Sequence, residues 1–218
     1  ALVTCTEAKT AALQELMAPS RYSTGLATGS GTDQTIVVAN SESPLFFEGA
    51  GKHSKLGELI GLAVMAAVKE ALKRQSGLTP AQQHDLLRRL RRFGFTEEAL
   101  WQRYREEAGA DPLIKAQFIA ALEKMTAVPA LFPLGVLFIH LYDEYFWGLL
   151  EKEETWEAAE TLLKEMAEVL FLSLKESVSM QDDYMKSMEH LLVYAVIERG
   201  RETLEETASK ETHADVGA

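Results

Sequence analysis

The sequence contains one cysteine, Cys5, in 218 residues, so no disulfide can form within the chain. Such low cysteine usage is typical of a reducing compartment, and we expect a cytoplasmic location. Basic residues are also scarce, with 22 Lys and Arg against 33 Asp and Glu and a net charge of −11. Because nucleic acids and anionic membranes are bound through basic surfaces, we expect neither as a partner.

The deficit of basic residues lies entirely in the second part of the chain. Residues 1–77 hold seven basic and seven acidic residues, which leaves 15 and 26 for the remainder. This change in composition predicts a domain boundary near Gly77. We therefore expect a portion of an α/β domain over 1–77, a helical domain over 78–206 and a disordered tail over 207–218.

Long uninterrupted apolar runs are absent too. The most apolar segment, 131–150, contains Pro133, His140, Asp143 and Glu144, and carboxylates are costly inside a bilayer. We expect a buried bundle helix there. His140 and Glu144 share a helix face and are candidates for a metal pair, but the partner pairs of a carboxylate bundle are not evident. We therefore expect no metal site.

The fold class expected for the first 77 residues is α/β: a short sheet with flanking helices. Apolar spacing predicts helices over 2–17 and 54–75, the second ended by Gly77. Residues 34–40 contain β-branched residues on both faces and predict a buried strand, and 45–47 predict a short strand that pairs with it.

The remainder of the chain reads as an all-α domain, which makes the protein mostly α overall. Capping and stop signals predict helices over 80–93, 97–108 and 112–125, and an apolar helical segment over 131–150. Amphipathic spacing predicts two long helices, over 155–178 and 181–206.

A first glycine-rich turn, Thr28–Asp33, precedes the predicted strand. Glycines let backbone amides approach a ligand, so Gly29 and Gly31 are candidates for holding an oxyanion, with Asp33 as a base. The hydroxyl residues Thr28, Ser30 and Thr32 are candidate donors or nucleophiles. The structural alternative is a tight turn in which the Asp33 side chain bonds its own backbone.

A second glycine-rich turn, Gly49–Lys55, leads into the helix over 54–75. His53 is a candidate acid or base near neutral pH, and Lys52 and Lys55 are candidates for holding an anion, with Glu58 one turn further on. The alternative is a helix N-cap formed by Ser54 in a solvated loop.

Three ordered blocks resemble the adenosylcobinamide amidohydrolase (CbiZ) family. They are Thr-Glu-Ala-Lys-Thr-Ala-Ala-Leu at 6–13, Ala-Thr-Gly-Ser-Gly-Thr-Asp at 27–33 and Gly-Lys-His-Ser-Lys-Leu-Gly-Glu-Leu-Ile-Gly at 51–61. The resemblance covers about a third of the chain. It implies hydrolysis of the amide that joins aminopropanol to the corrin ring, which yields adenosylcobyric acid in corrinoid (coenzyme B12) salvage.

Amide hydrolysis needs an activated nucleophile, stabilisation of an oxyanion and a proton for the leaving amine, and the residues of both turns can supply these roles. The expected catalytic residues are Asp33, which activates water, His53, which protonates the leaving amine, and Thr32, which with Ser30 is a rival nucleophile. The expected substrate-binding residues are Thr28, Gly29, Ser30, Gly31, Lys52, Lys55, Glu58, Glu7 and Lys9. From pattern alone, Glu7 and Lys9 lie on a solvated helix face.

The resemblance also bears on cofactors and partners. The corrinoid substrate carries its own cobalt, so no further cofactor is expected. Family members have an α/β segment before the block at Thr6, and we expect such an upstream segment to complete this domain. A homo-oligomer is left open. The alternative function is a non-catalytic corrinoid-binding or regulatory protein whose helical domain docks a partner.

Overall fold

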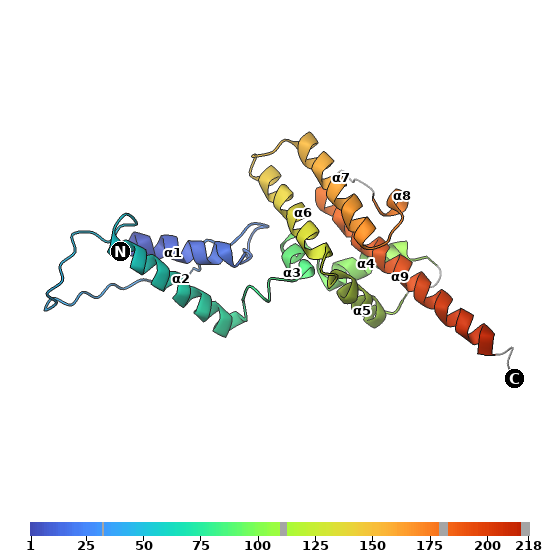
Figure 1. Cartoon of the computed structure of the whole chain (residues 1–218), viewed down its shortest axis with the longest axis horizontal. Coiled ribbons are helices and arrows are strands. Elements are labelled where there is room, and N and C mark those ends of the chain that lie inside the picture. The colour runs from blue at the N-terminus through green and yellow to red at the C-terminus, as the bar shows by residue number, and fades with distance from the viewer. Residues whose placement is uncertain (32, 110–112, 179–182, 215–218) are drawn as a thin grey trace. The chain divides into compact units, whose positions relative to one another are not determined.

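The computed structural model describes residues 1–31, 33–109, 113–178 and 183–214. It divides into two compact units, Ala1–His84 and Asp85–Ala218 (Figure 1). We refer to them as unit 1 and unit 2. All regular secondary structure in the described ranges is helical.

Unit 1 is built on two helices, α1 (Leu2–Glu15) and α2 (Lys55–Ser76), which pack side by side. Its buried apolar side chains come from the first helix and the turn that follows it: Ala8, Ala12, Leu13, Leu16 and Ala18. The bounds of α2 lie within one residue of the predicted ones. Ser54 caps its start by accepting a hydrogen bond from Gly57 N–H at 3.1 Å, and Gly77 ends it in the left-handed region at φ 70°.

The predicted sheet of unit 1 is wrong. Residues 34–40 and 45–47 form no strand, and the described part of unit 1 contains only one isolated antiparallel bridge, between Pro19 and Leu26. Ile36 is 86% exposed and Val38 is 89% exposed. A strand needs a neighbour to pair its backbone N–H and C=O groups, and no described residue supplies one. The segment is β-like in composition but pairs with none of the residues that the structure describes.

Unit 2 is helical, as predicted. It contains α3 (Leu86–Leu90), η1 (Arg91–Phe93), α4 (Glu97–Glu107), α5 (Lys115–Thr126), α6 (Leu131–Phe146), α7 (Lys152–Val169), α8 (Leu174–Ser177) and α9 (Tyr184–Ala214). Tyr184 lies at the centre of its core, where the hydroxyl donates to Phe138 O at 2.8 Å and the ring lies 4.3 Å from that of Phe138. Burial raises the pKa of Tyr184.

Several helix bounds in unit 2 differ from the prediction. The helix expected from residue 80 begins only at Leu86, where the Asp85 side chain caps it by accepting from Arg88 N–H at 2.9 Å. Two helices take the place of the one expected over 155–178, because α7 ends at Val169 and α8 follows it. Helix α9 continues past Glu206 to Ala214. The start expected at Asp111 and Pro112 lies outside the described residues.

The break after α7 is made by Phe171. Its backbone has φ 58°, Phe171 N–H donates to Glu168 O at 3.0 Å, and Leu172 N–H donates to Ala167 O at 2.9 Å. This is the helix-ending motif in which glycine usually takes the left-handed position. For a residue with a side chain that conformation costs about 1–2 kcal/mol. Phe171 is 92% exposed, so burial of the ring does not offset the cost.

Among the described residues, no single helix has both the length and the apolar character needed to cross a membrane. Helices α5 and α6 meet those criteria only when taken together, and they are bent by 88° at their junction.

Candidate functional site

Helix α1 anchors both glycine-rich turns. Thr4, Glu7, Thr10 and Gln14 recur at helical spacing along one side of it. Thr10 Oγ1 donates to Thr28 O at 2.8 Å, and Gln14 Nε2 donates to Ala27 O at 3.1 Å, so these two residues hold the first turn.

The second turn is held by the N-terminal half of the same helix. Thr4 Oγ1 donates to Ala50 O at 2.9 Å, and Lys52 Nζ lies 3.1 Å from Glu7 Oε1. The two turns, far apart in sequence, are therefore attached to one α1 surface. Sequence reasoning missed Thr4, Thr10 and Gln14. Their signal was the regular spacing of residues able to donate hydrogen bonds on an otherwise small-residue helix.

Asp33 closes the first turn from within. Its Oδ2 accepts a hydrogen bond from Ser30 N–H at 2.6 Å, its own N–H donates to Ser30 O at 3.2 Å, and Lys9 Nζ lies 2.5 Å from Oδ2. A Cβ at Gly29 would lie 3.3 Å from the same oxygen, which leaves little room for a side chain there. The Asp33 carboxylate therefore bonds the backbone of its own turn, as the structural alternative predicted, and it also forms an ion pair with Lys9.

These bonds lower the pKa of Asp33. The hydrogen bond from Lys9 is the largest cause and that from the Ser30 backbone the next, because both stabilise the carboxylate. A carboxylate held in this way is a weaker base than a free one. In this arrangement Asp33 organises the turn, and it can act as a base only after Lys9 is displaced. Thr32 lies outside the described residues.

The remaining candidates of the first turn are backbone groups. No described residue accepts a hydrogen bond from the N–H of Gly29 or Gly31. A Cβ at Gly31 would meet nothing within 4 Å, so this part of the turn is open. These two amides have the chemistry of an oxyanion site.

The second turn serves as the start of α2. Ser54 Oγ donates to Gly51 O at 2.8 Å and caps the helix, while Lys55 and Glu58 form a pair at 2.6 Å. The His53 ring is exposed, and within the described ranges it takes part in no hydrogen bond or ion pair. No described contact joins His53 to Asp33, so their shared pocket stays a prediction.

The lowered pKa of Asp33 predicts a pH dependence. Because the folded-state pKa lies below the unfolded value of about 3.9, the stabilisation is present above that value and is lost as pH falls through the lowered pKa. We expect the Ser30 amide NMR resonance to titrate below pH ~4 and to be invariant in Asp33→Asn. A Ser30 resonance that titrates equally in both proteins would contradict the bond.

The candidate metal pair of unit 2 does not extend to a third ligand. His140 Nε2 lies 3.3 Å from Glu144 Oε1, whereas Asp143 is buried in an ion pair with Arg92. The described residues contain no group of three or more His, Cys, Asp or Glu side chains arranged to hold a metal ion.

Two polar turns on one helix, with open backbone amides, a carboxylate and exposed cations, are parts that hydrolases of amides use. Residues 1–80 match the family model of adenosylcobinamide amidohydrolase, CbiZ, an amidohydrolase family, and the match is consistent with a C-terminal part of that domain.

One curated relative has 46% identity over 76 residues, an uncharacterized protein of Methanocaldococcus jannaschii. The aligned region is 34% of this chain and 29% of the relative's length. No solved structure matches the chain.

Proposed function

We propose that unit 1 supplies the C-terminal part of a catalytic domain that hydrolyses the aminopropanol amide of adenosylcobinamide. The match of residues 1–80 to the family carries this proposal, and the attachment of both glycine turns to α1 supports it. Water adds to the amide carbon, the C–N bond breaks, and the products are the corrinoid carboxylate and aminopropanol. The cobalt belongs to the substrate.

The roles proposed for this chain follow from the chemistry of the step. The amides of Gly29 and Gly31 stabilise the oxyanion formed when water adds, and His53 gives a proton to the leaving amine. Asp33 takes the proton of water after the substrate has drawn Lys9 away. The pairs Lys52–Glu7 and Lys55–Glu58 lie beside the second turn and are available for the corrin side-chain amides.

The catalytic domain needs a further α/β segment. In unit 1 the side chains of Val38, Phe46, Leu59 and Leu62 are each at least half exposed, and Gly57 is the one buried residue of the apolar helix α2. A helix that is apolar around its circumference is normally covered on several sides. We propose that sequence equivalent to the unmatched part of the longer relative covers α2 and these exposed apolar side chains.

The test is turnover by the protein expressed from its complete reading frame. Adenosylcobinamide is added and released aminopropanol is measured. Asp33→Asn and His53→Ala should each lower the rate at least about 100-fold, the scale of a lost acid–base group. Glu42→Gln, an exposed acidic residue of the same loop, is the matched control and should keep the full rate. Full activity in both site variants would refute these roles.

The second candidate function is corrinoid binding without catalysis. The Lys9–Asp33 pair favours it, because it neutralises the proposed base. In that case adenosylcobinamide binds tightly to the unmodified protein, and no aminopropanol appears with either the unmodified protein or Asp33→Asn.

A further inference from the structure

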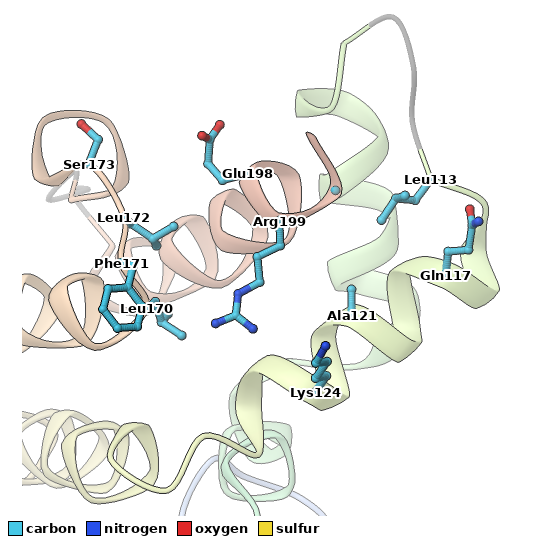
Figure 2. A pocket seen from close by; sticks show the side chains of 11 residues that line it. Leu113, Gln117, Ala121, Lys124, Leu170, Phe171, Leu172, Ser173, Glu198 and Arg199 are labelled. Atoms are coloured by element: carbon cyan, nitrogen blue, oxygen red, sulfur yellow. The ribbon is translucent and has the colours of Figure 1, made fainter. Parts of the chain in front are cut away.

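Unit 2 contains a cavity of about 490 Å³ that the proposed function does not use. It lies between α5, the segment 170–173 that follows α7, and α9 at 198–200 (Figure 2). Its volume is within the range of pockets that hold small organic molecules. All of its lining residues belong to unit 2.

The cavity combines an apolar wall with two cations. Leu113, Ala121, Leu170 and Leu172 supply the apolar wall. In Figure 2 the Lys124 ammonium and the Arg199 guanidinium extend into the same space, and the side chain of Glu198, which also lines the cavity, extends from α9 in another direction. Unit 2 carries 26 acidic and 15 basic residues, so its net charge is negative. The two cations that line the cavity have the opposite charge.

Phe171 stands at the edge of this cavity in a conformation that a glycine would take without strain. Met17 has the same type of conformation, φ 49°, at the end of α1, but its side chain is half-buried. The Phe171 ring is almost fully exposed and gains no comparable packing. Backbone strain that persists at an exposed aromatic residue beside a pocket indicates that the ring packs against a ligand.

We propose that this cavity binds a small organic anion with an aromatic body. Its carboxylate or sulfonate pairs with Lys124 and Arg199, and its rings lie against Phe171, Leu170 and Leu172. Arginine and lysine form strong charge-assisted bonds to such anions, and an aromatic ring offers an offset stacking surface. The site is independent of the hydrolase proposed for unit 1.

The experiment titrates the full chain with 2-naphthoate by calorimetry, with 2-naphthalenemethanol as the uncharged comparison. We expect one site with a Kd of about 1 mM or tighter, and binding of the alcohol at least tenfold weaker. Lys124→Glu and Arg199→Gln should each weaken naphthoate binding at least tenfold. Lys186→Glu is the control, because Lys186 is an exposed cation of α9 that does not line the cavity.

Phe171→Gly separates binding from a merely structural role. It should raise the unfolding midpoint of unit 2, since the strain is removed, and weaken naphthoate binding at least threefold. Far-UV circular dichroism checks that each variant is folded. The proposal is overturned if 2-naphthoate fails to bind, if the alcohol binds as tightly, if neither charge variant weakens binding, or if Phe171→Gly stabilises the unit with unchanged affinity.

Discussion

Replacement of Asp143 by Asn will destabilise unit 2 by about 3–5 kcal/mol, the cost of breaking a buried ion pair from one side. The Arg92 and Asp143 side chains are 5% and 7% exposed and form an ion pair between η1 and α6. Arg89 lies close to both, and burial is the main cause that lowers its pKa. Without the carboxylate, the buried Arg92 guanidinium loses this ion pair and lies close to the like charge of the half-buried Arg89.

Tryptophan fluorescence measures this loss selectively. The three tryptophans, Trp101, Trp147 and Trp156, all lie in unit 2, so urea unfolding followed by their emission reports that unit alone. Glu160→Gln is the control, since its pair with Lys164 is about half exposed and is worth at most ~0.5 kcal/mol.

The double variant Arg92→Met with Asp143→Leu tests the reason for the loss. Replacing both members of a buried pair by apolar residues is often neutral, so most of the stability should return. A loss below about 1 kcal/mol in Asp143→Asn would show that water reaches the pair.

Helix ends with local chemistry were predictable from the sequence. The cap at Ser54 and the stop at Gly77 each depend on atoms within four residues, and the structure confirms both. The break after Val169 was missed because the local signal for a helix end is absent there. It is made by Phe171 in a position where a glycine would have signalled it, so the pattern predicted one continuous helix.

The sheet was mispredicted because a strand depends on distant partners. Residues 35–38 are all β-branched and favour a strand, but propensity alone does not pair a backbone. The same limit applied to the site. Both glycine turns were found from their residues, whereas the contacts of Thr10, Gln14 and Lys9 with the first turn join segments 13 to 24 residues apart. The spacing of donors along α1 indicates which side chains share a face, but it does not indicate which distant backbone groups they bind.

Replacement of Gly57 by Ala will detach the second turn from α2. A Cβ at Gly57 would lie 1.9 Å from Gly51 O and 2.5 Å from Gly51 C, so the backbone of the turn has to move. That movement breaks the Ser54 cap and the bond from Thr4 to Ala50. Overpacking of this kind costs about 1–3 kcal/mol or more. In the hydrolysis proposed for unit 1, turnover should also be lost, because His53 moves with the turn.

Gly61, one turn further along α2, provides the matched comparison. A Cβ there meets nothing within 4 Å, so Gly61→Ala should stabilise the helix by up to about 1 kcal/mol. Amide hydrogen exchange of residues 49–60 measures both variants, with faster exchange expected in Gly57→Ala and slower exchange in Gly61→Ala. Equal protection of the turn in Gly57→Ala and the unmodified chain would mean that the turn does not pack on α2. If Gly61→Ala lowers the stability of the protein expressed from its full reading frame, the segment proposed to cover α2 contacts it at Gly61.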